Sequence, residues 1–263
     1  MVQEAAAELE KDKELLNWPL EGALELKDVS LRYRSDTDTV LKGISGCIRA
    51  RERVGVAGRT GSGKSSLTLA LFRIVELQRG HILIDGVDIQ TIGLHTLRRA
   101  MTMIPQDPVL FQGSLHYNLD PCSLHSEAAV QTVMKDVGLD FDIEKEVKEG
   151  GTNFSVGERQ LMCIARAGLA NPKVLVLDEA TSAIDHHTDS LIQQYVRTKF
   201  TCTVLTIAHR LHTILDSDRV MVLEQGRLVE FDSPRVLLAD KESAFGRLVQ
   251  SMGLEESRIS ALP

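Results

Sequence analysis

The nine residues 58–66, which read GRTGSGKSS, constrain the fold of this chain more than any other stretch. They match the spacing G-x-x-x-x-G-K-[ST], in which glycines let backbone N–H groups close on phosphate oxygens where a Cβ would obstruct them. Lys64 can reach the β- and γ-phosphates, and the Ser65 hydroxyl is placed to ligate Mg²⁺. The stretch therefore predicts a binding site for a nucleoside triphosphate.

The residues on both sides of this loop agree with that prediction. Arg53–Ala57 is typical of a short buried strand, and Ser66–Val75 of an apolar helix whose positive N-terminal end faces the phosphates. The alternative is a Gly/Ser surface loop before an ordinary helix. It does not account for Lys64, Ser65 and both flanks together.

Length, charge and cysteine content limit the remaining possibilities. A chain of 263 residues has room for one large α/β core, or for a core with a lobe. The net charge of -7 argues against nucleic-acid binding, because no basic excess exists to neutralise phosphates. The four cysteines are widely separated without a C-x-x-C pair, which favours free thiols in a reducing compartment. No apolar run approaches a membrane span and no signal peptide is recognisable, so we expect a cytosolic chain.

The segments before the phosphate loop predict a lead-in and an antiparallel region. Residues 1–22 are an N-terminal lead-in of helical composition, either a helix or a frayed tail. The alternation across Leu24–Tyr33 indicates a half-buried strand, and Val40–Ile48 returns as further strand. Tyr33 is equally compatible with packing at a sheet edge and with stacking on a base.

The region after residue 123 predicts two helices with a break between them. Residues 123–147 have a helical pattern, and Ser155 is placed to cap the next helix, with Glu158 completing a capping box. This is either only a well-capped helix start, or a site where Ser155 and Gly157 offer donors to an anion at a positive helix end.

Two carboxylates follow a strand that the sequence predicts to be central. Val174–Leu177 is uninterruptedly apolar, as in a parallel strand covered on both faces, and Asp178 and Glu179 come at its carboxyl end, where such sheets bind ligands. We expect Asp178 to hold Mg²⁺ through water and Glu179 to take the proton from an attacking water. The next buried strand, Thr203–Ala208, ends at His209.

Taken in order, these features resemble the ATP-binding cassette of ABC transporters over roughly residues 23–250. Four stretches are similar to the second cassette of the multidrug resistance-associated protein group, subfamily C: 58–66, 118–121 (NLDP), 153–160 (NFSVGERQ) and 207–210 (IAHR). The resemblance implies an α/β fold, with a P-loop NTPase RecA-like core of mostly parallel sheet, an antiparallel β subdomain and an inserted α-helical lobe at about 100–168. The cassette would span 23–252, followed by a tail at 253–263.

The resemblance also implies ATP and Mg²⁺ as ligands, with a role for each matching residue. Tyr33 would stack on adenine, Glu179 would be the general base and His209 would contact the γ-phosphate. Asp185, where the sequence continues into a helix through Gln194, would communicate across a head-to-tail dimer. The full set for ATP is Tyr33, Gly58, Arg59, Thr60, Gly61, Ser62, Gly63, Lys64, Ser65, Ser66, Gln106, Ser155, Gly157 and Asp185, with Glu179, His209 and Lys64 catalytic. The metal set is Ser65, Gln106 and Asp178.

The implied partners are a second nucleotide-binding domain and the transmembrane domains of a transporter, on the cytoplasmic face of a membrane. ATP would be clamped between the phosphate loop of one domain and the signature of the other, without nucleic acid or direct membrane insertion. Val156 and Glu158 stand where the general family pattern has Gly and Gln. We expect Glu158 to weaken the clamp on the partner's nucleotide. The segment between Val137 and Glu149 is shorter than in the family, which we expect to affect packing of the helical lobe.

The function that this implies is ATP hydrolysis that powers export of organic anions or drugs. The alternative is a truncated, non-transporting cassette that binds ATP and docks on or regulates a full transporter. An ABC-type ATPase acting on nucleic acid or ribosomes is disfavoured by the acidic charge. A GTPase is disfavoured because the sequence has no [NT]-K-x-D motif.

Overall fold

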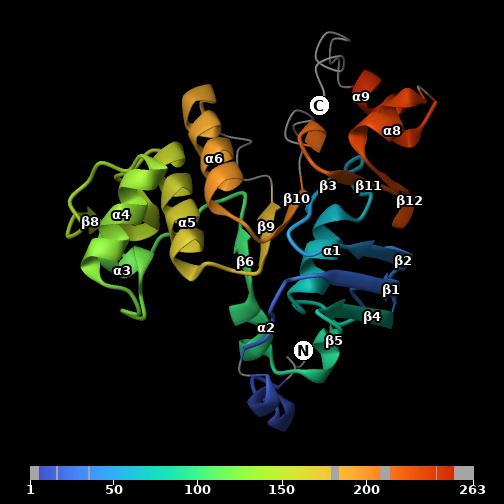
Figure 1. Ribbon diagram of the computed structural model, residues 1–263, viewed down its shortest axis with the longest axis horizontal. Helices are drawn as coiled ribbons and strands as arrows, with labels where there is room; N and C mark the ends of the chain where they lie inside the picture. The colour runs from blue at the N-terminus through green and yellow to red at the C-terminus, as the bar shows by residue number, and fades with distance from the viewer. Residues whose placement is uncertain are drawn as a thin grey trace. The chain divides into compact units, whose positions relative to one another are not determined.

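The computed structural model describes residues 6–15, 17–34, 36–178, 184–207, 214–240 and 242–251 (Figure 1). These residues form two compact units. The first takes the described residues up to Met101, residues 173–177 and those from Cys202 onward. The second takes Thr102–Pro172 and the described part of Asp178–Thr201. Among the described helices, none is long and apolar enough to cross a membrane.

One sheet of the first unit is antiparallel, as the sequence before the phosphate loop predicts. Its strand order is β2-β1-β4-β5. Strand β1 ends two residues before Tyr33, and β4 and β5 form a hairpin across Asp85 and Gly86. The strands are β1 (Leu24–Leu31), β2 (Leu41–Ile48), β4 (Arg79–Ile84) and β5 (Val87–Asp88).

The second sheet of this unit contains the buried strands that the sequence predicts. From one edge, the order is β12-β11-β3-β10-β9, with β3 parallel to both β10 and β11. The apolar run Val174–Leu177 is fully buried, which confirms a strand covered on both faces. The strands are β3 (Arg53–Ala57), β9 (Val174–Asp178), β10 (Thr203–Ile207), β11 (Arg219–Glu224) and β12 (Arg227–Asp232).

Two helices of the first unit, α8 and α9, come after its last strand in the sequence. Helix α8 begins with Pro234 after the Ser233 cap, as proline at a first helical turn indicates. Helix α9 buries Phe245 against Val220 and Val222 of β11. The helical elements are η1 (Glu10–Glu14), α1 (Lys64–Leu71), η2 (Ile89–Thr91), α2 (Leu94–Ala100), α8 (Pro234–Ala239) and α9 (Ala244–Ser251).

The lead-in forms a short 3-10 turn instead of a regular α-helix across its described part. Asp12 accepts a hydrogen bond from the Gly93 N–H at 2.9 Å, and the carbonyl of Ala6 accepts one from the Leu94 N–H at 3.1 Å. These bonds satisfy N–H groups at the start of α2 that a helix itself leaves without partners. The described lead-in residues are therefore attached to the first unit.

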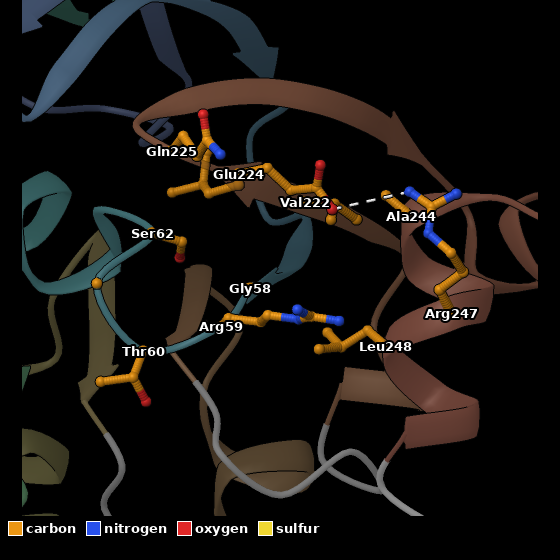
Figure 2. Close-up of a pocket in the computed structure, with 12 residues that line it drawn as sticks. Gly58, Arg59, Thr60, Ser62, Val222, Glu224, Gln225, Ala244, Arg247 and Leu248 are labelled. Carbon is orange, nitrogen blue, oxygen red and sulfur yellow. Dashed lines mark ion pairs between the residues drawn. The ribbon is translucent and has the colours of Figure 1, made fainter.

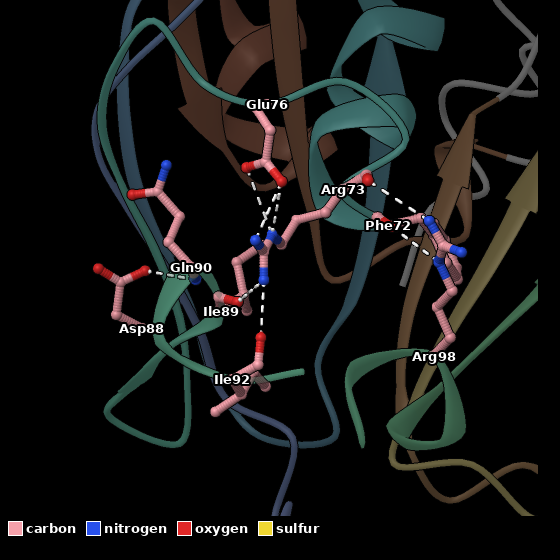
Figure 3. Close-up of polar contacts among 8 residues, drawn as sticks. All are labelled: Phe72, Arg73, Glu76, Asp88, Ile89, Gln90, Ile92 and Arg98. Carbon is pink, nitrogen blue, oxygen red and sulfur yellow. Dashed lines mark hydrogen bonds and ion pairs between the residues drawn. The ribbon is translucent and has the colours of Figure 1, made fainter. Parts of the chain in front are cut away.

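Helix α1 is shorter than the predicted stretch to Val75, because Arg73 adopts a left-handed conformation with φ of 46°. Arg98 of α2 donates to the carbonyls of Phe72 and Arg73 at 3.3 and 3.4 Å (Figure 3). A cation at this end suits the negative pole of the helix. The helix that carries the phosphate loop is thus fixed at its far end.

Arg73 itself is a buried structural cation. It donates to the carbonyls of Ile89 and Ile92 at 2.7 and 2.8 Å, and to the carboxylate of Glu76 at 3.0 Å (Figure 3). A buried charge with these partners avoids most of the cost of desolvation. It ties the end of α1 to the segment that leads to α2.

The second unit is mainly helical, as the resemblance implies for an inserted lobe. The predicted helix across 123–147 is wrong in extent: α4 ends at Val137, because Gly138 adopts φ of 86° as its C-cap. Helix α6 begins after Asp185, which is its N-cap and not part of the helix, and it runs beyond Gln194. The elements are β6 (Met101–Ile104), which carries the chain in from the first unit, β7 (Gly113–Ser114), α3 (Leu115–Leu119), α4 (Glu127–Val137), β8 (Glu146–Val147), η3 (Glu149–Gly151), α5 (Val156–Ala170) and α6 (His186–Lys199).

Helices α4, α5 and α6 pack together in this unit (Figure 1). The contact is close at Gly168 of α5, where a Cβ would lie 2.4 Å from the Tyr195 hydroxyl of α6 and 3.3 Å from Val133 of α4. Only glycine permits this approach. Helix α5, which begins at the signature, therefore packs closely against both α4 and α6.

Candidate functional site

The phosphate loop lies between β3 and α1, and its glycines have the backbone angles that the motif predicts. Gly58, Gly61 and Gly63 have φ of 152°, 79° and 109°. A Cβ on Gly58 would be 2.4 Å from the carbonyl oxygen of Leu223, whereas nothing lies within 4 Å of a Cβ on Gly61. The loop is thus tightly packed at its start and open at its tip, where a ligand can approach.

The lysine of the loop is folded back on it. Lys64 is only 6% exposed, and its Nζ donates to the carbonyls of Gly58 at 2.8 Å and Arg59 at 3.3 Å. These bonds hold an ammonium group at the N-terminal end of α1, where the helix dipole is already positive. These groups form an anion-binding site in which the Lys64 ammonium group is already in position.

Two further side chains converge on the same helix. The hydroxyls of Tyr33 and Ser66 share a hydrogen bond at 2.7 Å, although the strand ends before Tyr33. The Tyr33 side chain is 42% exposed, so much of its ring is available to a ligand. Ser65 is exposed in the first turn of α1. An aromatic ring, a cation and a hydroxyl therefore lie around one helix end.

This set of groups fits a nucleoside triphosphate with magnesium. Open glycine amides, a positive helix end and an ammonium bind phosphate oxygens. A hydroxyl oxygen is a ligand that Mg²⁺ accepts beside phosphates and waters. The open space at Gly61 and the exposed Ser65 leave room for both.

The signature in the second unit has the predicted capping box. The Ser155 hydroxyl accepts from the Glu158 N–H at 3.2 Å, and the Glu158 carboxylate accepts from the Ser155 N–H at 2.7 Å. A Cβ on Gly157 would lie 3.2 Å from the Thr188 side chain, so α5 begins close to the start of α6. Asp185 accepts from the N–H and the hydroxyl of Thr188, and these two bonds lower the pKa of its carboxyl. Ser155, Gly157 and Asp185 therefore belong to one corner of the second unit.

Side chains from the segment before the signature support this corner, and nothing in the sequence signalled them. The rings of Phe141 and Phe154 meet edge to face at 5.4 Å, and the Lys145 ammonium lies 3.6 Å from the centre of the Phe141 ring. Asn153 accepts from the Lys148 N–H at 3.0 Å and donates to the Glu146 carbonyl at 2.8 Å. No motif marks these partners, since the contact joins residues 13 positions apart.

The segment between Val137 and Glu149 is packed against the rest of the second unit. Leu139, Ile143 and Val147 are each less than a tenth exposed. Strand β8 pairs antiparallel with β7, which joins the end of this segment to the start of α3. These positions of the lobe are therefore well packed, and the expected effect of a shorter segment stays a prediction.

The remaining predicted site residues lie in several separate segments. Gln106 is exposed in the loop after β6, and the carbonyl of its neighbour Pro105 accepts from Gln160 of α5 at 3.2 Å. Asp178 is partly buried at the end of β9, as predicted. Glu179 and His209 lie outside the described residues, and their roles stay predictions.

The second unit also carries an exposed apolar patch made of Val109, Phe111 and Tyr117, which are 58%, 61% and 50% exposed. Asn118 of α3 accepts from the Phe111 N–H at 2.9 Å and donates to its carbonyl at 2.8 Å. Arg166 of α5 donates to the carbonyl of Val109 at 2.7 Å. The patch therefore has a fixed backbone beneath it, and large exposed apolar patches mark interaction surfaces.

The comparison with known protein families identifies the class of this domain. A family model described as ABC transporter matches residues 41–182, which is more than half of the chain. The chain belongs to the ABC transporter family. It is an ABC-type ATP-binding domain, and domains of this class are ATPases.

Individual relatives of this ABC-type domain point to subfamily C. The chain is 51% identical to rat ATP-binding cassette sub-family C member 2, over 91% of this chain and 16% of that protein. It is 48% identical to ABC transporter C family member 3 of Dictyostelium discoideum, over 95% of this chain and 18% of that protein. The chain thus spans about a sixth of the length of these relatives. The resemblance to subfamily C is confirmed.

A solved structure shows the same fold. A bacterial Atm1-family ABC exporter with ATP bound superposes with a TM-score of 0.83 at 36% identity, over 89% of this chain and 42% of that chain. Together with the two sheets and the helical unit, this confirms the predicted α/β P-loop NTPase fold of the ABC domain.

Proposed function

We propose that this ABC-type domain hydrolyses ATP with Mg²⁺ to power export of organic anions or drugs through the membrane domains of a transporter. The observation that carries the proposal is the nearly buried Lys64 ammonium, 2.8 Å from the Gly58 carbonyl in a glycine loop at a positive helix end. The identity of about 50% to subfamily C transporters supports the transporter context.

The residues of this chain divide the work of hydrolysis. Lys64 exchanges its loop carbonyls for the β- and γ-phosphate oxygens, while Tyr33 stacks on the adenine. Glu179 takes the proton from the attacking water, and His209 contacts the γ-phosphate. Mg²⁺, when bound, neutralises phosphate charge, and Ser65, Gln106 and Asp178 would hold it.

Partners complete the site and use its energy. A second nucleotide-binding domain in a head-to-tail dimer would receive the signature, with Ser155 and Gly157 facing its ATP and Asp185 communicating across the interface. The exposed patch of Val109, Phe111 and Tyr117 fits an apolar surface of the membrane domains, since its backbone is fixed by Asn118 and Arg166. In this proposal the domain works at the cytoplasmic face of a membrane.

The experiment that tests this proposal separates binding from hydrolysis. We expect Glu179→Gln to bind ATP normally and to hydrolyse it about 10²–10⁴-fold more slowly, because a general base is lost. Lys64→Ala should lose ATP binding itself, whereas the exposed Lys148→Ala serves as the matched control. Binding of a fluorescent ATP and release of phosphate are measured together. Undiminished turnover in Glu179→Gln rejects the assignment of the base.

The same assay tests the alternative, a cassette that binds ATP and docks on or regulates a full transporter without transport. Phosphate release is measured with and without a partner cassette. Hydrolysis that requires Glu179 and rises with the partner supports the exporter. ATP binding without hydrolysis in both conditions supports the regulatory cassette.

A further inference from the structure

A cavity of about 430 Å³ lies against the phosphate loop, and residues 58–62 of the set assigned to ATP form one of its walls (Figure 2). Its volume is within the range of small-molecule sites. Neither Tyr33, Lys64 nor Ser65 is among the residues that line it. The cavity lies instead between the loop residues 58–62, the β11 end with its turn at 222–225, and the first turn of α9. It is therefore a separate space that shares one wall with the nucleotide site.

The charged groups of the cavity sum to one positive charge. Arg59 and Arg247 contribute guanidinium groups, and Glu224 contributes a carboxylate. The Arg247 and Glu224 side chains approach only to 3.9 Å and are each about half exposed, so their ion pair is loose. Figure 2 shows the Arg59 side chain lying along the cavity toward Leu248. Figure 2 marks no ion pair between Arg59 and the other lining residues.

A buried hydroxyl on the shared wall also has no partner. Ser62 is 5% exposed, and its Oγ makes no hydrogen bond among the described residues. Figure 2 shows this oxygen on the side of the loop that faces Arg59. Buried polar groups are nearly always hydrogen-bonded. A buried hydroxyl without a partner beside a cavity therefore indicates that a polar group of a ligand binds there.

The rest of the lining is largely aliphatic. Val222 and Leu223 of β11 form one side, and Ala244 and Leu248 of α9 form another. Such a surface favours an apolar ligand body, while two guanidinium groups and a hydroxyl favour an anionic head. Glu224 would repel a ligand with several negative charges.

We propose that this cavity binds a small organic anion that carries one carboxylate or sulfonate on an apolar body. The anionic group lies between Arg59 and Arg247, within reach of the Ser62 hydroxyl, and the apolar body covers Leu223 and Leu248. The single net positive charge of the cavity sets the preference for a monoanion. This site is an addition to ATP hydrolysis and does not depend on it.

A ligand in this cavity is coupled to ATP through residues 58–62, while Tyr33, Lys64 and Ser65 stay available to the nucleotide. Residues 58–62 line the cavity and also form the first half of the phosphate loop. The loop is attached to the β11–β12 turn by the bond from the Gly226 N–H to the Ser62 carbonyl at 3.0 Å. A ligand that fixes this wall changes ATP affinity, and by linkage ATP changes the affinity for the ligand by the same factor.

The probe for the test is anilinonaphthalene sulfonate, a fluorescent monoanion with an apolar body. It is titrated into the 263-residue protein without nucleotide. Arg247→Gln should weaken binding about tenfold, because a charge-assisted contact is lost. Arg247→Lys should retain most of the affinity. Arg235→Gln, on the exposed face of α8, is the matched control and should change nothing.

A second arm adds ATP with magnesium. Coupling predicts that the apparent Kd of the probe approaches a plateau as ATP rises, whereas competition predicts an increase without limit. Equal probe affinity in Arg247→Gln and the parent, or unlimited competition by ATP, overturns the proposal. The first arm uses no nucleotide, so its outcome is independent of whether this domain hydrolyses ATP.

Discussion

The phosphate loop and the signature are both short polar segments before a helix, but different kinds of contact hold them. The phosphate loop is built from its own backbone, with glycines at positive φ and a lysine bonded to carbonyls five and six residues away. The signature is supported by side chains from distant parts of the second unit, namely Phe141, Lys145 and Thr188.

This difference determines which changes each segment tolerates. The function of the phosphate loop depends on the path of its backbone. A methyl group on a glycine that packs against other backbone should therefore disrupt the loop. In the signature, the capping box and the contact of Gly157 with α6 hold the start of α5 through side chains. We therefore expect the phosphate loop to be sensitive to glycine substitution, and the signature to be sensitive to changes in its supports.

The largest effect should follow Gly58→Ala. The Cβ would lie 2.4 Å from the Leu223 carbonyl oxygen, at φ of 152°. Both the strain and the contact with rigid backbone oppose this residue, so we expect a loss of about 3 kcal/mol in unfolding free energy. Urea denaturation measures the loss, and a fluorescent ATP should no longer bind.

Gly61→Ala is the matched control in the same loop. Its φ is 79°, but nothing lies within 4 Å of the added Cβ. Only the left-handed conformation is penalised, by about 1 kcal/mol. If the two variants lost equal stability, then conformational strain alone would govern the loop and its packing against Leu223 would be irrelevant.

A smaller effect should follow Phe154→Leu, which tests the supports of the signature. The substitution keeps an apolar side chain but loses the edge-to-face contact with Phe141 and the ring near Lys145. We expect a loss of about 1–2 kcal/mol in unfolding free energy. ATP affinity at the phosphate loop should be unchanged in a direct binding titration.

Lys145→Met separates the charge from the packing. Methionine keeps the aliphatic contact with the rings and removes the cation, so about 0.5–1 kcal/mol should be lost. A larger loss from Lys145→Met than from Phe154→Leu would show that the lysine acts through some contact other than the two rings.

The same contrast explains what could be predicted from sequence. The phosphate loop, the buried run before Asp178 and the Ser155 capping box were predicted correctly, because each signal lies within a few consecutive residues. The extent of the helix predicted across 123–147 was wrong, because the pattern did not account for the left-handed Gly138 that ends α4.

Features assembled from distant segments gave no comparable signal. The Arg73 and Arg98 contacts at the end of α1 depend on where the segment after η2 returns. Three segments line the cavity at the phosphate loop, namely the loop, the end of β11 and α9. More than 150 residues of sequence separate the loop from β11. Only the tertiary structure brings its two guanidinium groups and the Ser62 hydroxyl to one space.

An effect of similar size concerns the capping box. Ser155→Ala should lower the unfolding free energy by about 1 kcal/mol, because the Glu158 N–H loses its acceptor. Glu158→Gln should cost only a few tenths, since an amide oxygen can still accept from Ser155. If Glu158 weakens the partner's nucleotide clamp through its charge, Glu158→Gln should raise ATP occupancy there in an assembled pair of cassettes. Unchanged affinity and dwell time would end that proposal.

The smallest expected effect is on acid stability, and it compares one carboxylate from each unit. Asp85 accepts from the N–H groups of Glu21, Gly22 and Ala23, and buried Asp120 accepts from those of Leu124 and His125. Burial alone would raise the pKa of each carboxyl, but these bonds outweigh it and hold each pKa below the ordinary value of 3.8.

The pKa of each carboxyl is lower in the folded protein than in the unfolded chain. Each carboxylate therefore stabilises the fold at pH values above the ordinary Asp pKa, and this contribution is lost as the pH falls through the folded-state pKa. Asp85→Asn and Asp120→Asn should each make unfolding free energy less dependent on pH below about 4. Urea denaturation at a series of acidic pH values measures the slope. We expect the greater flattening for Asp120→Asn, because Asp120 is 5% exposed and its bonds are less screened by solvent. A greater effect at Asp85 would mean that the number of N–H donors, and not burial, sets how strongly a loop carboxylate couples stability to pH in this domain.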